Sequence, residues 1–178
     1  MSRIFGATRQ VAMVVHDIDV AIATMVDKLG IGPFFILREI TPEDYRYKGE
    51  TCPAPVISLA FAFSGDLNIE LIEQHNDAPS AYRDFLNKRG EGVQHFSSWT
   101  SRAEEFDALR GGAIAAGYAI VHEGRVGSNR FAYVDTIDPV FGMCFELAEG
   151  LTPDLAPIVE RMREIAQDMR SPSPMNRL

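Results

Sequence analysis

The sequence has few cysteines and no long apolar run, and each shortage excludes a class of protein. Its two cysteines, Cys52 and Cys144, share no CxxC or zinc-finger spacing, so they indicate neither a redox motif nor a structural zinc site. No apolar run approaches the roughly 20 residues that a membrane-spanning helix needs. The opening stretch, MSRIFGATRQ, also lacks the apolar core of a signal peptide. We therefore expect no membrane partner and a cytoplasmic location.

Positive charge is scarce as well. The chain carries 17 Lys and Arg against 25 Asp and Glu, which gives a formal charge of −8. No basic stripe is present to displace counterions from phosphates, so nucleic acid is excluded as a partner. A small anionic substrate stays compatible, because a local patch can oppose the net charge. Hydrophobic residues make up 46% of the 178 residues, enough for a packed core.

The first half of the chain predicts the order β-α-β-β-β. Asp17 or Asp19 can cap the helix, and Gly30 can end it. A polar, proline-bearing segment, 41–55, is predicted to be a loop. The predicted elements are a strand at 10–15, a helix at 19–29, a strand at 34–40 and two strands at 58–63 and 67–74.

The same order returns in the second half. Ser101, with Glu104 three residues on, has the pattern of a capping box at the start of a helix. Turns are predicted at 127–128 and 138–139. The predicted elements are a strand at 92–99, a helix at 103–117 and strands at 118–126, 129–137 and 143–149, with a connecting helix at 80–89 between the halves.

This internal repeat of about 80 residues predicts an α+β fold of two βαβββ modules. The modules are residues 8–76 and 92–150, a connecting segment spans 77–91, and a C-terminal helix and tail span 151–178. The helix at 155–169 is amphipathic, and we expect it to pack on the back of the sheet or on a second subunit. Its apolar stripe consists of Leu155, Ile158, Val159, Met162, Ile165 and Met169.

Superimposing the two halves brings four polar side chains to matching positions. Gln10 and His95 lie on the first strands, and Glu70 and Glu146 lie on the last strands. A carboxylate among apolar residues on a covered face is costly unless something pairs with it. One imidazole, two carboxylates and one amide oxygen suit one divalent cation, such as zinc, nickel, cobalt, manganese or iron. The alternatives are a satisfied core histidine, solvated glutamates and a hydrogen-bonded core amide.

The repeat and these four positions resemble the vicinal-oxygen-chelate superfamily, with a glyoxalase/bleomycin-resistance-like fold, over roughly residues 8–149. The segment FLNKRGEGVQHFSSW is similar to one in methylmalonyl-CoA epimerases, except that Gln94 replaces the first of two histidines. Gln10 and Glu70 also depart from the epimerase pattern, and the full set matches that of some glyoxalases I. The resemblance implies a curved mixed sheet around a metal pocket, and a homodimer.

The resemblance further implies a divalent-metal-dependent isomerase, epimerase or lyase. Such an enzyme moves a proton next to a carbonyl through an enolate, on an acyl-CoA or a hydroxy-carbonyl compound. Glu146 and Glu70 are the expected base and ligand, and Glu39 is a further catalytic candidate. One alternative is a metal-free small-molecule binding or resistance protein of the same fold. Another is a ring-cleaving dioxygenase, which would favour two histidines and one carboxylate.

Several other side chains could lie near such a site. His16 is expected at the surface, and His122 on the outer or rim side of its strand. Trp99 shares strand parity with His95, so it could wall the pocket or pack in the core. A coenzyme A thioester would need cations near the mouth, and the candidates are Arg38, Arg46, Lys48, Lys88, Arg89 and Arg130.

Overall fold

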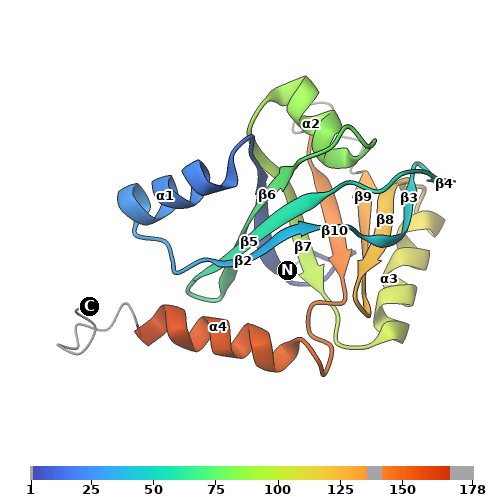
Figure 1. Ribbon diagram of the computed structural model, residues 1–178. Helices are drawn as coiled ribbons and strands as arrows, with labels where there is room; N and C mark the ends of the chain where they lie inside the picture. The colour runs from blue at the N-terminus through green and yellow to red at the C-terminus, as the bar shows by residue number, and fades with distance from the viewer. Residues whose placement is uncertain (1, 136–141, 169–178) are drawn as a thin grey trace.

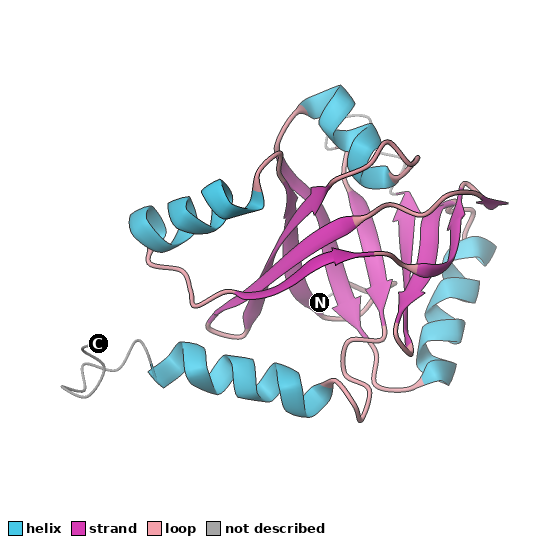
Figure 2. Cartoon of the chain, in the orientation of Figure 1, coloured by secondary structure: helices cyan, strands magenta, loops and turns pink. Residues whose placement is uncertain are grey.

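A computed structural model describes residues 2–135 and 142–168 of the chain (Figure 1). Four helices accompany one curled sheet (Figure 2). The helices are α1 (Ile18–Leu29), α2 (Ala81–Arg89), α3 (Ala103–Ala115) and α4 (Ala156–Asp168). The strands are β1 (Thr8–Val14), β2 (Phe35–Ile40), β3 (Glu43–Tyr47), β4 (Glu50–Thr51), β5 (Ile57–Ser64), β6 (Leu67–Gln74), β7 (Gly92–Trp99), β8 (Ile120–Val126), β9 (Asn129–Asp135) and β10 (Cys144–Ala148).

The described strands form one mixed sheet in the order β2-β5-β6-β1-β7-β10-β9-β8-β3-β4. The first strands of the two halves, β1 and β7, pair antiparallel at its centre. Each is flanked by the last strand of its own half, running parallel to it: β6 beside β1, and β10 beside β7. The predicted α+β architecture, a curved mixed sheet followed by a C-terminal helix, is confirmed.

Helices α1 and α3 cover the outer face of the sheet, one on each half (Figure 1). Asp17 caps α1 by accepting from the backbone of Asp19 and Val20, and Gly30 ends it in the left-handed region. Ile18 of α1 packs against Leu71, and Phe106 of α3 belongs to the cluster on the other half. With the outer face occupied, the alternate side chains of each strand face the concave side.

The predicted loop at 41–55 is wrong, because this segment contains β3 and β4. The sequence EDYRY of β3 buries Tyr45, and it is held by pairing with β8. Arg125 of β8 binds Glu43 and also Asp44, at 2.7 Å from the latter. Gly124 permits the approach, since a Cβ there would lie 3.0 Å from the Glu43 carbonyl oxygen. A strand stabilised by a partner so distant in the chain leaves little trace in its local pattern.

The connection from β2 to β3 determines the curvature. β2 is one edge of the sheet, and β3 lies next to the other edge. Only Thr41 and Pro42 separate these two strands. Consecutive Cα atoms are 3.8 Å apart, so Ile40 and Glu43 lie within about 11 Å of each other. The two ends of the sheet are thereby drawn together, and the concave face becomes the wall of an enclosed space.

Two local predictions are corrected. The helix α3 has Arg102 as its N-cap without a side-chain bond, and Glu105, not Glu104, accepts from the Ser101 backbone at 3.1 Å. α4 does not lie on the back of the sheet: it packs beside β5, below the concave face in Figure 1. The turn predicted at 138–139, Met169 and the tail lie outside the described residues. Within the described part, no helix is long and apolar enough to cross a membrane.

Candidate metal site

Four strands bring the four predicted ligands to the centre of the concave face. Gln10 lies on β1, Glu70 on β6, His95 on β7 and Glu146 on β10. They are 3%, 6%, 0% and 8% exposed, respectively. Because β1 and β7 are adjacent and each has its last-strand partner on its far side, the four side chains converge from neighbouring strands. The sequence repeat therefore predicted which residues meet.

Two neighbouring amides hold the imidazole and the carboxamide in orientation. His95 Nδ1 lies 2.8 Å from the Gln94 Oε1 acceptor, so Nδ1 carries a proton. His95 Nε2 then faces the carboxylates, 3.4 Å from Glu70 Oε2 and 3.6 Å from Glu146 Oε2. Gln10 Nε2 donates to Asn68 Oδ1 at 2.9 Å, which leaves its Oε1 free to point elsewhere. Gln94, at the place of a histidine in the epimerases, is thus a support for His95.

These residues fit a divalent metal by the chemistry of their free atoms. Gln10 Oε1 is buried with no hydrogen-bond partner among the described residues, and His95 Nε2 has only its long contacts to Glu70 and Glu146, so a bound cation would satisfy both atoms. Ligand atoms about 2.1 Å from a tetrahedral ion lie about 3.4 Å apart. The separations around His95 match that spacing. Within residues 2–135 and 142–168, no group of three or more His, Cys, Asp or Glu side chains already has the arrangement of a metal site.

Without a cation, a proton on His95 balances the charge of the two carboxylates. Burial alone would lower the pKa of His95, but hydrogen bonding and attraction to Glu146 and Glu70 outweigh it and raise the pKa to about 9. Burial raises the pKa of Glu70, and its hydrogen bond to His95 offsets this only in part. A protonated His95 between two carboxylates is therefore the metal-free form. A metal would displace that proton, because only the neutral imidazole nitrogen can ligate.

The cluster opens into a cavity of about 660 Å³, which we call the site cavity. Its walls are mostly apolar, and they include Trp99, for which the sequence had left both the pocket wall and the core open. The helix α4 forms the side opposite the sheet, anchored by Thr152 Oγ1, which donates to Asn129 Oδ1 at 2.8 Å. The apolar residues of the lining are Phe35, Ile36, Leu37, Ile57, Leu59, Phe61, Phe63, Trp99, Val126, Phe131, Ala148, Leu155, Pro157, Ile158, Val159 and Met162.

A tyrosine pair beside the carboxylates was missed in the sequence. Tyr82 of α2 and Tyr133 of β9 both line the site cavity, and their hydroxyl oxygens are 2.9 Å apart. Burial, reinforced by the negative charges of Glu70 and Glu146, raises the pKa of both hydroxyls well above the usual value. They are therefore neutral donors. Their strand and helix positions carry no motif, so only the folded arrangement identifies them.

His122 is fully buried, so the expectation of a rim position is wrong. Its ring packs edge-on against Tyr133 and Tyr82, with centroids 4.1 and 4.8 Å away. Its Nδ1 lies 3.0 Å from the Tyr45 hydroxyl, which donates to the Pro79 carbonyl. Burial, helped by repulsion from His95, lowers the pKa of His122 to about 3. This neutral histidine therefore links Tyr45 of β3 to the tyrosine pair that lines the site cavity.

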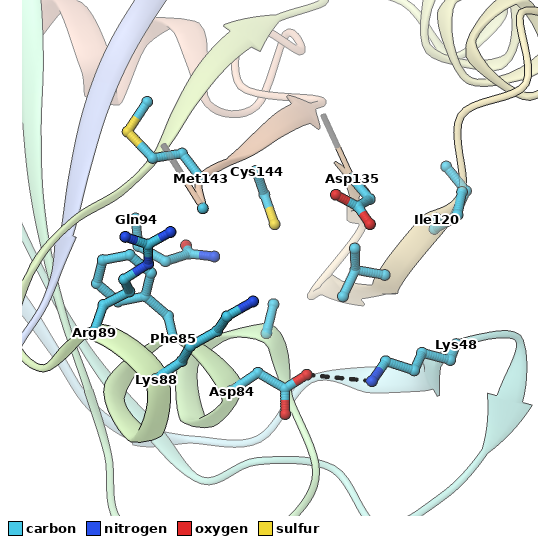
Figure 3. Close-up of a pocket in the computed structure, with 14 residues that line it drawn as sticks. Lys48, Asp84, Phe85, Lys88, Arg89, Gln94, Ile120, Asp135, Met143 and Cys144 are labelled. Atoms are coloured by element: carbon cyan, nitrogen blue, oxygen red, sulfur yellow. Dashed lines mark hydrogen bonds and ion pairs between the residues drawn. The ribbon is translucent and has the colours of Figure 1, made fainter. Parts of the chain in front are cut away.

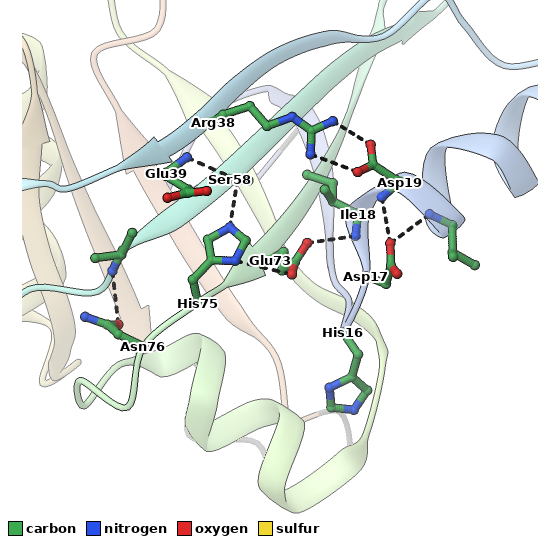
Figure 4. Close-up of polar contacts among 12 residues, drawn as sticks. His16, Asp17, Ile18, Asp19, Arg38, Glu39, Ser58, Glu73, His75 and Asn76 are labelled. Atoms are coloured by element: carbon green, nitrogen blue, oxygen red, sulfur yellow. Dashed lines mark hydrogen bonds and ion pairs between the residues drawn. The ribbon is translucent and has the colours of Figure 1, made fainter.

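Glu39 is not brought to the cluster. Its side chain is exposed, it is absent from the cavity lining, and its backbone N–H donates to Ser58 Oγ at 3.1 Å (Figure 4). Ser58 Oγ is also 2.8 Å from His75 Nε2, and His75 Nδ1 is 3.3 Å from Glu73 Oε1. This arrangement resembles a hydrolase triad, but Ser58 is 0% exposed and cannot reach a substrate. The group instead joins strand ends to the start of α1, since Glu73 accepts from the Ile18 backbone.

The basic candidates gather elsewhere. Lys48, Lys88 and Arg89 line a second cavity of about 760 Å³, beside α2 (Figure 3), and none of the three lines the site cavity. Lys48 Nζ is 3.3 Å from Asp84 in that cavity. Arg38 is bound to Asp19, and Arg130 to Glu149 and Asp107. Of the six predicted cations, only Arg130 therefore lines the site cavity, and it is paired with Glu149 there.

Comparison with known proteins agrees with this fold. The profile of the glyoxalase/bleomycin resistance protein/dioxygenase superfamily matches residues 9–133. Methylmalonyl-CoA epimerase from Mycobacterium tuberculosis is 24% identical, with a TM-score of 0.59 over 88% of this chain and 95% of that one. A variant of the Streptomyces coelicolor epimerase, in complex with 2-nitronate-propionyl-CoA, is 21% identical, with a TM-score of 0.55 over 82% and 95%.

A hypothetical protein from Bacillus halodurans C-125 is also similar, at 19% identity and a TM-score of 0.53 over 80% of this chain and 92% of that one. No curated protein matches the sequence. At these identities the structural neighbours establish the fold, whereas the profile covers more than half of the chain. The chain therefore belongs to the glyoxalase/bleomycin resistance protein/dioxygenase superfamily.

Proposed function

We propose that the chain is a divalent-metal-dependent isomerase, epimerase or lyase that moves a proton next to a carbonyl group. Gln10, Glu70, His95 and Glu146 would hold the metal. The observation that carries the proposal is that buried His95 Nε2 lies within 3.6 Å of two buried carboxylates, Glu70 and Glu146, on a face where buried Gln10 Oε1 has no hydrogen-bond partner among the described residues. The likeness to methylmalonyl-CoA epimerases supports the same class of chemistry.

The chain's own residues divide the work. A bound divalent metal supplies a positive charge that stabilises negative charge developing on a carbonyl oxygen. Glu146 or Glu70 serves as the base that removes and returns the proton, because a carboxylate in a desolvated site is suited to that role. Gln94 and Asn68 keep His95 and Gln10 in orientation. The apolar walls exclude water from the reacting carbon.

Elemental analysis tests the metal directly. Protein purified without a metal-affinity tag should carry about one divalent ion per chain, or take one up on addition of zinc, nickel, cobalt, manganese or iron. The double variant Glu70→Ala/Glu146→Ala should lose it. Glu39→Gln is the matched control, since it removes an exposed carboxylate outside the cavity. An ion retained by the double variant would refute the assigned ligands.

Activity then needs two assays, epimerisation of an acyl-CoA and isomerisation of a hemithioacetal. Turnover in either one that follows metal content would support the proposal. A stable one-to-one metal complex with no turnover in either assay, or on any hydroxy-carbonyl compound tried, would remove the enzyme assignment and leave a metal-binding protein.

A metal-free small-molecule binding protein is the second candidate, and one observation favours it. His95 lies within 3.6 Å of both carboxylates, and its pKa is raised to about 9, so a proton can hold the cluster together without a metal. Protein that takes up none of the five metals, yet binds a small molecule in the site cavity, would establish this alternative.

A further inference from the structure

The site cavity is much larger and more apolar than the chemistry at the carboxylates requires. Its volume of about 660 Å³ lies in the range that encloses a drug-sized molecule. The reacting polar part of a substrate, next to the proposed metal ligands, would occupy one end of the site cavity. The other walls come from the aromatic strands β2, β5 and β9 and from α4.

The helix α4 borders this space, and Ala166 is the one residue of the helix that is buried. Its stripe residues Leu155, Val159 and Met162 line the cavity, yet each remains half-buried. An apolar side chain that faces a void lacks the dispersion contacts of a packed interior. A ligand with apolar surface of its own would supply the contacts that the helix lacks.

The charges of the lining argue against a polyanion in the same space. Three glutamates face it: Glu70, Glu146 and Glu149. Its two arginines are already paired, Arg130 with Glu149 and Arg161 with Glu164. Phosphate groups would therefore meet a negative wall without a spare cation.

From these observations we propose that the substrate is a carbonyl compound with a bulky, uncharged, ring-bearing group, which lies between the aromatic strands and α4. The placement of its carbonyl at the carboxylate end rests on the proposed function. The rings of Phe61, Phe131 and Trp99 would make edge and offset contacts with a ring in the substrate. The apolar group determines affinity, and the metal end determines reactivity.

Binding of two matched probes by calorimetry tests the inference. Phenacyl alcohol and hydroxyacetone carry the same hydroxy-ketone and differ only in phenyl against methyl. Burying the additional apolar surface of the phenyl ring should make phenacyl alcohol bind on the order of 50-fold more tightly. Metal content is measured on the same samples.

A variant that fills the cavity tests where the phenyl ring of the probe binds. Val159→Phe should weaken the binding of phenacyl alcohol at least tenfold. The affinity for hydroxyacetone and the metal binding should stay unchanged. Ile114→Phe, at an exposed apolar position of α3, is the matched control and should change neither probe. Circular dichroism melts of both variants exclude a folding defect.

The outcomes separate the two proposals. Equal affinity for both probes in metal-loaded protein, or no effect of Val159→Phe, would overturn this inference and leave the proposed function in place. A strong preference for phenacyl alcohol, abolished by Val159→Phe in protein that binds no metal, would support the apolar ligand class and remove the proposed function.

Discussion

At the scale of single residues, Glu70 and Glu146 are buried carboxylates that face His95, whereas the equally buried Glu149 is paired with Arg130. Glu146→Gln keeps the volume of the side chain but removes its charge and its basicity. We expect a loss of turnover of about 10²- to 10⁴-fold, which is the usual contribution of a positioned base, together with weaker metal binding. Steady-state kinetics and metal titration measure the two effects. Full activity in this variant would refute the mechanism, and His16→Ala, at an exposed position, should behave as the wild type.

Tyr82 provides a test of the hydroxyl pair. Tyr82→Phe keeps the ring but leaves the Tyr133 hydroxyl without its partner at 2.9 Å. The free energy of unfolding should fall by about 1 kcal/mol, measured by urea denaturation. Tyr118→Phe, whose ring packs on Phe5, is the comparison. An unchanged midpoint for Tyr82→Phe would mean that the pair contributes no net stability.

His122 should make stability depend on pH. Its folded pKa of about 3 lies below the ordinary value of 6.5, so the unfolded chain binds the extra proton first. The stabilisation is complete above pH 6.5 and is lost as the pH falls towards 3. The slope reaches about 1.4 kcal/mol per pH unit. In His122→Phe, the free energy of unfolding, measured by urea denaturation, should depend less on pH between 6.5 and 3 than in the wild type. Parallel curves for the two proteins would contradict the assignment.

At the scale of elements, α4 packs mainly against one strand, β5. Beyond Thr152, its ties include Arg163, which stacks over Phe63 at 5.5 Å and lies 3.9 Å from Asp66. Helices with few buried contacts open locally at low free energy. We predict that hydrogen exchange in α4 is faster than in β7, and that Arg163→Ala accelerates it further without changing β7. Mass spectrometry of peptides from the two elements measures both. Equal protection of α4 and β7 would show a firmly docked helix.

The elements that could be predicted from the sequence are those whose patterns are local. Alternating apolar runs identified β5, β6 and β7, and the Asp17 and Gly30 caps delimited α1. β3 could not be predicted, because EDYRY buries only Tyr45 and depends on β8, which lies some 80 residues away. The stripe of α4 indicated that something covers it but not what. Likewise, the sequence could place a histidine in β8 but could not reveal the tyrosines around it.

The positions of the four proposed ligands on adjacent strands could be predicted, because the internal repeat relates the two halves by their order of strands, while their role as ligands stays a prediction. That relation fixes which strands are adjacent and so which polar residues converge. Glu39 failed by the same criterion, since it has no counterpart in the second half and rests on a loop alignment. The tyrosine pair and the cavity under α4 depend on packing between segments that no repeat relates.

At the scale of the whole molecule, we propose a homodimer. The outer face of the central strands exposes Val93 and Phe96, each 37% accessible, between α1 and α3. Light scattering should give twice the mass of the 19.7 kDa chain. Phe96→Glu should convert the protein to a monomer. Val20→Glu, on the exposed side of α1, should leave it dimeric. A wild-type mass of one chain would refute the dimer.

The junction between β3 and β8 also has a consequence for how the half-barrel opens. Glu43 and Arg125, which stabilise it, are 82 positions apart, and the central strands β1 and β7 pair over a similar separation, since Thr8 lies opposite Ser98. Loop length therefore does not distinguish the two contacts. The β3–β8 junction lies close to an edge of the sheet, so we expect it to part before the central strands under stress. Separation of β3 from β8 would open the cavity to a bulky ligand. The strands that carry the proposed metal ligands, β1, β6, β7 and β10, would keep their pairing.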